Sequence, residues 1–263
     1  MDLQIDGNAA LVTASSSGLG KASATALARE GVDVVVNGRD EDRLAEAVAE
    51  IESVAEGSVV GQQGDLTVKD DVESLVERTV DEFGRLDHLV TSAGGPTPLR
   101  PLEADDEDWY HAYDLLVMSV VRAVRAAEPH LVADDGGTIV NITSRVVKEA
   151  SASNVLSSAV RMGVIGFEKT LSKDLGPEVR ANAVLPGAHE TPRIEEMVEA
   201  AVERGDAESY DDAMAARTGD IPVARFGDPM ELGDLVAYLS SPRSGFVNGQ
   251  AVTIDGGSGS STV

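Results

Sequence analysis

Two serines and one arginine have the residue types and the spacing to do chemistry. Ser144 ends the strand-like run "GTIVNITS", and the helical segment "SNVLSSAVRMG" that follows it carries Ser157 and Arg161. A serine hydroxyl can polarise a substrate oxygen, and a guanidinium holds a permanent positive charge. Because small residues make up most of this segment, we expect Arg161 to point at a nucleotide or a substrate. Ser157 has no base beside it, so a packing role is its alternative.

A glycine-rich turn near the N-terminus, "VTASSSGLGKA" (12–22), forms a second candidate site. Gly18 and Gly20 would let the backbone approach a pyrophosphate at a helix N-terminus, where free N–H groups favour an anion. The next strand ends in "VVNGRD", with Gly38 where an acid would hold ribose hydroxyls and Arg39 able to accommodate a 2′-phosphate. The pattern therefore predicts NADP(H) in preference to NAD(H), with an ordinary surface charge as the alternative for Arg39.

Apolar runs alternate with helical periodicity along the chain, and these elements must position both candidate sites. Nearly all-apolar strands separated by helices of ten or more residues predict a parallel sheet covered on both faces. The fold class is therefore α/β, one doubly wound domain over residues 1–263. The expected strands are 8–14, 32–38, 58–66, 86–95, 137–143, 179–185 and 250–257, and the expected helices are 21–31, 40–56, 69–83, 106–133, 154–175 and 230–240.

Two segments depart from this alternation. Residues 188–228 are acidic, helical in parts, and lie between a strand and the last helix. Insertions after the carboxyl ends of strands surround the ligand crevice of an open α/β sheet. We therefore predict a substrate lid here, with a surface excursion as the alternative. The C-terminal residues 258–263 are rich in glycine and serine and predict a loose tail.

The composition excludes several classes of function. The 263 residues include no cysteine. The chain has 46 Asp and Glu residues but only 21 Lys and Arg residues, which gives a net charge of −25. Disulfides and cysteine metal sites cannot form, and we expect no metal site. So negative a surface repels nucleic acid and anionic membranes, and no apolar run is long enough for a membrane helix. With no signal peptide at the N-terminus, we expect a cytoplasmic protein. The acid-rich, lysine-poor composition suggests halophilic adaptation, with a solvated acidic face as the alternative.

Five motifs follow one another along the chain: "TASSSGLG" (13–20), "GDL" (64–66), "TSAG" (91–94), "ANAVLPG" (181–187) with Thr191 after it, and "DGG" (255–257). Together they resemble the short-chain dehydrogenase/reductase family over the full length of the chain, although Ala14 replaces the first glycine of the first motif. The resemblance implies a Rossmann-type fold that binds NADP(H). The residues it implies at the cofactor are Thr13, Ser15, Ser16, Ser17, Gly18, Leu19, Gly20, Asn37, Gly38, Arg39, Asp65, Leu66, Ala93, Gly94, Gly95, Arg161, Pro186, Gly187 and Thr191.

The catalytic pattern of this family is only partly present. The family spaces its residues as Ser-x12-Tyr-x3-Lys and adds an asparagine on the preceding helix. Ser144 matches the serine, but Ser157 stands at the tyrosine, Arg161 at the lysine and Leu116 at the asparagine. A serine hydroxyl is a far weaker acid than a phenol, and arginine does not release its proton. The resemblance therefore implies an atypical site without the usual proton donor.

Other residues could supply that proton. His189 lies two residues past Gly187, where the resemblance places the nicotinamide, and imidazole titrates near neutrality. We therefore include His189 among the candidate catalytic residues, with a packing role as its alternative. Tyr210 in the expected lid and Lys148 beyond Ser144 are weaker candidates.

The resemblance implies an NADP(H)-dependent oxidoreductase that acts on a small carbonyl/alcohol pair, including 3-oxoacyl compounds. Its alternative is a catalytically inactive nucleotide-binding sensor or partner subunit, because the phosphate turn fits both. The resemblance also implies a homotetramer or homodimer formed through helices 106–133 and 154–175, where small residues suit close packing.

Overall fold

The computed structural model describes residues 1–133, 136–203, 205 and 207–262. Within them a single parallel sheet contains β3 (Val59–Gln63), β2 (Asp33–Gly38), β1 (Ala9–Val12), β4 (His88–Thr91), β5 (Gly137–Ile142), β6 (Val179–Pro186) and β7 (Ala251–Ile254), in that spatial order. The order reverses between β1 and β4, which is where an open α/β sheet binds its ligand. The predicted doubly wound α/β fold is confirmed.

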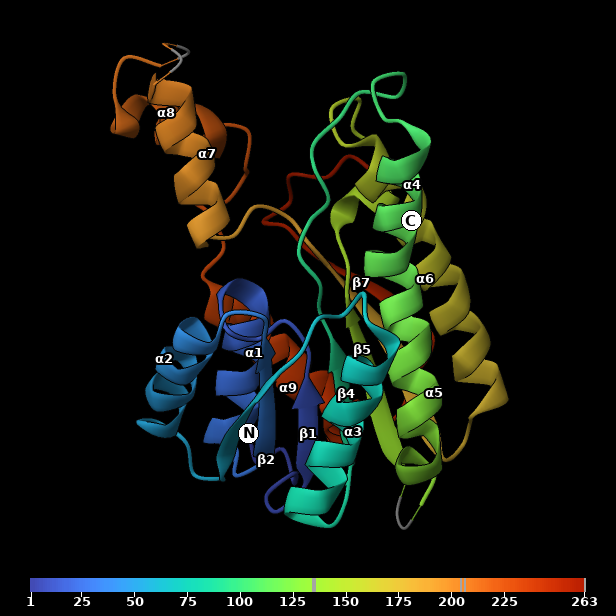
Figure 1. The fold of residues 1–263 in the computed structure, drawn as a ribbon. Helices are drawn as coiled ribbons and strands as arrows, with labels where there is room; N and C mark the ends of the chain where they lie inside the picture. Colours follow the sequence, from blue (N-terminus) through green and yellow to red (C-terminus); the bar gives the residue numbers. More distant parts are fainter. Residues whose placement is uncertain (134–135, 204, 206, 263) are drawn as a thin grey trace.

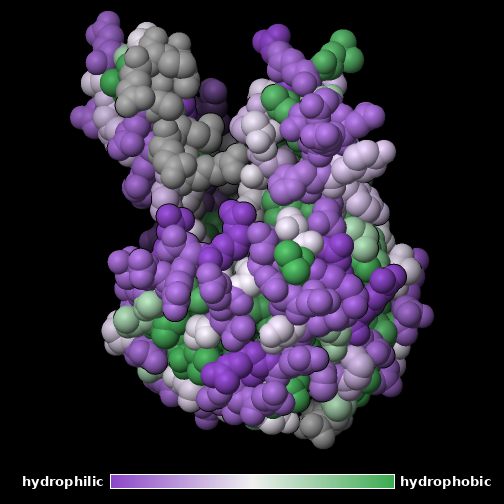
Figure 2. Space-filling model, viewed as in Figure 1, coloured by the Kyte–Doolittle hydropathy of each residue, from purple (hydrophilic) through white to green (hydrophobic). Residues whose placement is uncertain are grey.

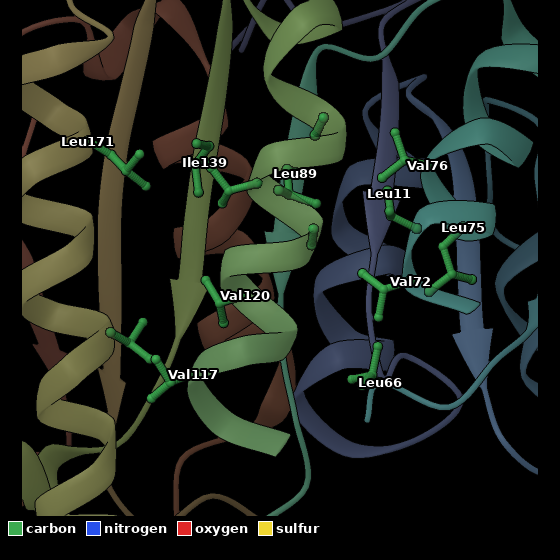
Figure 3. Packing of buried hydrophobic residues seen from close by; sticks show 14 of the residues in the cluster. Leu11, Leu66, Val72, Leu75, Val76, Leu89, Val117, Val120, Ile139 and Leu171 are labelled. Atoms are coloured by element: carbon green, nitrogen blue, oxygen red, sulfur yellow. The ribbon is translucent and has the colours of Figure 1, made fainter. Parts of the chain in front are cut away.

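Helices cover both faces of the sheet (Figure 1). They are α1 (Gly18–Arg29), α2 (Glu41–Glu52), α3 (Lys69–Phe83), α4 (Asp106–Tyr113), α5 (Ser119–Leu131), α6 (Val155–Asp174), α7 (Pro192–Glu203), α8 (Tyr210–Thr218) and α9 (Pro229–Ser240). Side chains alternate along each strand, so Leu11 packs toward α3 and α5 whereas its neighbours Ala10 and Val12 pack toward α1 and α9. Figure 3 shows the first of these two cores, with Leu11, Leu89 and Ile139 facing the helix side chains.

Glycines let α1 approach its neighbours closely. A Cβ on Gly20 would lie 2.4 Å from the carbonyl oxygen of Ala14, and one on Gly233 of α9 would lie 2.5 Å from that of Ala22. Both distances are too short for any side chain. The N-terminus of α1 is therefore held against the end of β1 on one side and against α9 on the other.

The predicted helix 106–133 is interrupted. Residues Asp114–Met118 form a π turn between α4 and α5, and Leu116 is in the middle of it, 2% exposed. Such turns insert one extra residue into a helix and are frequent at functional sites. The sequence predicted one continuous helix over residues 106–133 and gave no sign of this extra residue.

The segment 188–228 holds α7 and α8, which project from the body beyond the carboxyl ends of the strands (Figure 1). Its two ends meet in a short parallel bridge between His189 and Gly227. Figure 2 shows a notch between the projection that carries α8 and the one that carries α4. The segment therefore flanks the edge of the sheet where the candidate site lies.

Candidate active site

The glycine-rich turn forms a cradle that fits a phosphate. Ser17 precedes α1, and the first regular helical bond runs from the N–H of Lys21 to the carbonyl of Ser17. The N–H groups of Gly18, Leu19 and Gly20 precede that bond, so they point out of the helix end toward a bound anion. Gly18 has a φ of 56°, and a Cβ on it would lie 3.8 Å from Cγ2 of Thr191. Thr191 thus lies across the turn from Gly18.

The side chain of Asn37 holds the backbone of this cradle in place through two hydrogen bonds. Its Oδ1 accepts a hydrogen bond from the N–H of Ala14 at 3.0 Å, and its Nδ2 donates to the carbonyl of Gly64 at 3.1 Å. These bonds hold Ala14 at a φ of 46°, the left-handed region that a residue with a Cβ rarely adopts. The glycine that the family has at this position would adopt it without strain.

Several predicted cofactor residues have their side chains in the scaffold and not on the cradle surface. Thr13 donates to the carbonyl of Ser92 at 2.7 Å, and this contact ends the predicted strand 86–95 at Thr91. Ser15 donates from its hydroxyl to the carbonyl of Val12. Thr13, Ser15, Asn37 and Leu66 are all buried.

The residues predicted to distinguish NADP(H) from NAD(H) lie together at the end of β2. A Cβ on Gly38 would lie 2.7 Å from Oγ of Ser16, so the two residues are in contact. The Arg39 side chain is 78% exposed, with Nη1 3.9 Å from Oδ2 of Asp65. A hydrogen bond from the backbone N–H of Thr67 lowers the pKa of Asp65, with smaller contributions that include Arg39. An exposed guanidinium beside a serine hydroxyl fits a phosphate group on the adenosine ribose.

Arg161 links the two motifs at the chemical end of the site. The residue is 6% exposed, its Nε donates to Oγ of Ser157 at 3.1 Å, and its Nη2 donates to the carbonyl of Gly94 at 3.4 Å. Below it lies a cavity of about 10 Å³, lined by Thr91, Leu116, Thr143 and Arg161 among others, the size of one water molecule. The predicted pair of Ser157 and Arg161 is therefore brought together with the "TSAG" segment.

Ser144 begins the loop beside this pair. Its Oγ accepts from the N–H of Val146 at 3.4 Å, which starts a 3₁₀ turn at Arg145–Val147. The same loop is tied to α6, where the N–H of Ser151 donates to Oγ of Ser158 at 3.2 Å. Within the described residues the Ser144 hydroxyl has no acceptor for its hydrogen, so that hydrogen is available to a substrate oxygen.

The structure places His189 inside the base of the 188–228 segment. The residue is 4% exposed, its Nδ1 lies 3.3 Å from the carbonyl oxygen of Gly187, and its ring lies against Gly227. Within the described residues Nε2 has no hydrogen-bond partner, and burial lowers the pKa of His189. His189 is thus about as buried as Arg161, and its role as a proton donor stays a prediction. Tyr210 begins α8 and is 41% exposed, and Lys148 is exposed on the loop.

A buried polar pair joins β4 to β5 and was not predicted from the sequence. Thr91 at the end of β4 donates to Oδ1 of Asn141 on β5 at 2.7 Å, and within the described residues Nδ2 of Asn141 is buried without a partner. Polar side chains inside otherwise apolar strands are the signal that could have identified this pair. The pair adjoins the cavity under Arg161, because Thr91 is one of the residues that line it.

The family model described as enoyl-(acyl carrier protein) reductase matches residues 13–259. The 3-oxoacyl-[acyl-carrier-protein] reductase of Thermotoga maritima is 32% identical over 256 residues, which cover 97% of this chain and 99% of the relative. The chain belongs to the short-chain dehydrogenase/reductase family. A second 3-oxoacyl-[acyl-carrier-protein] reductase, from Synechocystis, is 34% identical over 250 residues, 94% of this chain and 95% of the relative.

Solved structures agree with this membership. The L-sorbose reductase of Gluconobacter frateurii, complexed with NADPH and L-sorbose, has a TM-score of 0.94 at 29% identity and covers 99% of this chain and 100% of its own. Actinorhodin polyketide ketoreductase with NADPH has a TM-score of 0.90 at 31% identity, covering 97% and 98%. The relatives in this family are NAD(P)-dependent oxidoreductases. Among the described helices, none combines the length and apolar character needed to cross a membrane.

Proposed function

We propose that this family member is an NADP(H)-dependent oxidoreductase with an atypical active site, acting on a small carbonyl/alcohol pair that includes 3-oxoacyl compounds. The observation that carries the proposal is the buried Arg161, bonded to Ser157 and to the "TSAG" segment at Gly94, at the same sheet edge as an open phosphate cradle.

When bound, the reduced nicotinamide supplies the hydride, so the protein has to bind, orient and polarise. Gly18, Leu19 and Gly20 would hold the pyrophosphate, and Thr191 would lie near it. Ser144 and Ser157 would donate hydrogen bonds to the substrate oxygen. Arg161 would strengthen the Ser157 hydroxyl as a donor, because Nε already donates to its oxygen. None of these three groups releases a proton near neutrality, so the proton comes from another group, with His189 as the first candidate, or from solvent.

The preference for NADP(H) rests on Arg39, Ser16 and Gly38. Arg39 is exposed and only loosely paired with Asp65, so its guanidinium is available to a phosphate on the ribose. Two of the solved relatives contain NADPH. Their cofactor supports the proposal for this chain but was observed in those proteins.

The wider organisation is part of the same proposal. Residues 188–228 would close over the substrate as a lid, and the exposed face of α6, with Ala159, Met162 and Gly163, would pack in a homotetramer or homodimer. The acidic surface would suit a cytoplasm of high salt. Most of the face drawn in Figure 2 is hydrophilic.

Binding and turnover together test the function. The affinities for NADPH and NADH are measured first, and then the oxidation of NADPH is followed over a panel of ketones and 3-oxoacyl thioesters in high salt. Tighter binding of NADPH together with turnover supports the proposal. Tight binding with no turnover on any substrate would instead favour the sensor or partner role, which the missing tyrosine makes the second candidate.

A further inference from the structure

The last turn of the chain contacts both walls of the candidate site. Residues 255–261 follow β7, and we call them the C-terminal strap. A Cβ on Gly187 would lie 2.6 Å from Cβ of Asp255, so the strap begins directly against the turn predicted to hold the nicotinamide. A Cβ on Gly256 would lie 2.7 Å from Cγ2 of Val223, at the end of the 188–228 segment. The strap therefore contacts this wall of the site at two points.

Hydrogen bonds give the strap a defined shape. The carboxylate of Asp255 accepts from the N–H of Gly257 at 3.0 Å through Oδ1 and from the N–H of Gly259 at 2.8 Å through Oδ2. Gly256 and Gly257 have φ values of 64° and 81°, which glycine adopts without strain. The sequence predicted a loose tail over 258–263. The structure instead shows that residues 258–261 are hydrogen-bonded to Asp255 and to Glu149.

Glu149 connects the strap to the opposite wall. Its Oε1 accepts from the N–H of Ser260 and, at 2.6 Å, from the N–H of Ser261. Its Oε2 lies 3.7 Å from Nη1 of Arg145, the residue that follows Ser144. One carboxylate thus binds the end of the chain with one oxygen and the start of the Ser144 loop with the other.

We propose that Glu149 is a positioning residue that fixes Ser144 relative to the Gly187 turn by holding loop 145–153 against the C-terminal strap. Catalytic groups must be held within a fraction of an ångström of their productive geometry, and loops achieve this only when their neighbours hold them. Hydrogen bonds to a charged acceptor are the stronger kind, so the two N–H groups on Oε1 are a suitable restraint. The kinetic part of this inference rests on the oxidoreductase function proposed above, whereas the structural part does not.

A double-mutant cycle between Glu149 and the strap tests the proposal. The variants are Glu149→Ala, a chain ending at Gly259, which keeps the bond from Gly259 to Asp255, and the two combined. Hydrogen exchange of peptide 145–153 should rise in each single variant, and the combination should exchange no faster than either, because all three break the same contact. Glu149→Gln keeps an acceptor oxygen and should restore part of the protection. Glu46→Ala removes the same charge from an exposed position on α2 and should leave exchange unchanged.

Kinetics supply a second readout in the full-length protein. Glu149→Ala should lower kcat/KM by about tenfold to a hundredfold, the cost of a misplaced catalytic group, while the NADPH affinity stays within about twofold because the cradle on α1 is untouched. Two outcomes would overturn the proposal. In one, the effects of Glu149→Ala and the truncation on hydrogen exchange simply add. In the other, Glu149→Ala leaves the exchange of the loop unchanged. A non-additive exchange cycle without turnover on any substrate would support the contact and contradict the oxidoreductase function.

Discussion

Arg161 donates from Nε to the hydroxyl oxygen of Ser157 one helical turn earlier, at 3.1 Å, so the residues that replace the family's lysine and tyrosine are bonded to each other. The pair keeps a positive charge at the site and aligns a hydroxyl with it. Neither member changes its protonation state near neutrality. The chemistry of the site therefore depends on charge and hydrogen bonding, and the proton has to come from elsewhere.

Arg161→Met should lower kcat/KM by about a hundredfold, the usual effect of removing one electrostatic donor from an active site. Methionine has a similar length but no charge, so the packing of α6 should survive. Arg161→Lys keeps the charge but cannot donate to Ser157 and Gly94 in the same geometry, so it should recover only part of the activity. Steady-state kinetics check both, with circular dichroism as the control for folding. Equal activity in wild type, Arg161→Met and Arg161→Lys would show that Arg161 has no part in the proposed mechanism.

Arg39→Ala should weaken NADPH binding by about tenfold or more while leaving NADH binding nearly unchanged, because only NADPH carries the 2′-phosphate. Fluorescence titration of each reduced cofactor measures the two dissociation constants. The effect should shrink at high salt, since the Arg39 side chain is 78% exposed and is screened. A parallel loss for both cofactors would mean that Arg39 acts on the shape of the turn and not on the phosphate.

Ala14→Gly should raise the stability of the protein, although most substitutions to glycine lower it. Ala14 has a φ of 46°, a region that costs a residue with a Cβ about 1 kcal/mol or more. Glycine gains conformational freedom in the unfolded chain, so the net gain should be about 0.5 kcal/mol. Ala45→Gly, at an exposed position of α2, is the matched control and should destabilise by about 1 kcal/mol. Thermal melts compare the two, and a Tm for Ala14→Gly below wild type would contradict the assigned strain.

Much of the fold was readable from the sequence, because strands buried on both faces are nearly all apolar and the helices between them are periodic. Leu11 and its neighbours illustrate why: each face of β1 needs its own apolar side chains, so the whole run is apolar. The cofactor end was readable for a related reason, since Gly18 and Gly20 serve local backbone geometry. These features depend on residues that are close in the chain.

Other features depend on distant contacts and were not readable. The ring of His189 lies against Gly227, 38 positions later, and nothing in the sequence indicated this contact or the burial that it causes. Glu149 and Ser260 are more than a hundred residues apart in the sequence, so no local sequence pattern could predict that they are hydrogen-bonded. The register of Ser157 and Arg161 was predicted, but the bond between their side chains and the one to Gly94 required the structure.

Glu168→Gln should stabilise the protein above pH 7 and have no effect below about pH 4. Burial raises the pKa of Glu168 from 4.5 to about 7, and within the described residues its Oε1 has no partner. The unfolded chain therefore loses this proton at lower pH than the folded chain, so stability falls as pH rises from 4.5 to 7 and then stays lower. Glutamine removes that dependence, and the difference at pH 8 should be about 3 kcal/mol.

Urea denaturation at several pH values measures the difference between wild type and Glu168→Gln. Glu77→Gln on the exposed side of α3 provides the control and should give a difference that does not vary over the same range. A Glu168→Gln variant that is less stable than wild type at pH 8 would show that the ionised carboxylate has a favourable partner.

Stability should rise steeply with KCl if the acidic surface is adapted to high salt. Wild type carries a net charge of −25, and screening shortens to about 3 Å at 1 M salt, so mutual repulsion falls. Melts from low salt to several molar KCl measure the slope, with sucrose as a control for general exclusion from the protein surface. An equal Tm with and without salt would contradict halophilic adaptation.

The π turn at Asp114–Met118 determines the rotational phase of the helix that follows it. One residue corresponds to about 100° of rotation in an α-helix, and the turn inserts one between α4 and α5. The core side chains of α5, among them Val124 and Leu131, face the sheet only in the phase that the inserted residue gives them. Deleting one residue between 114 and 118 would restore a regular helix and turn that face away from the core. The position of Leu116 is therefore tied to the packing of α5 and cannot be adjusted alone.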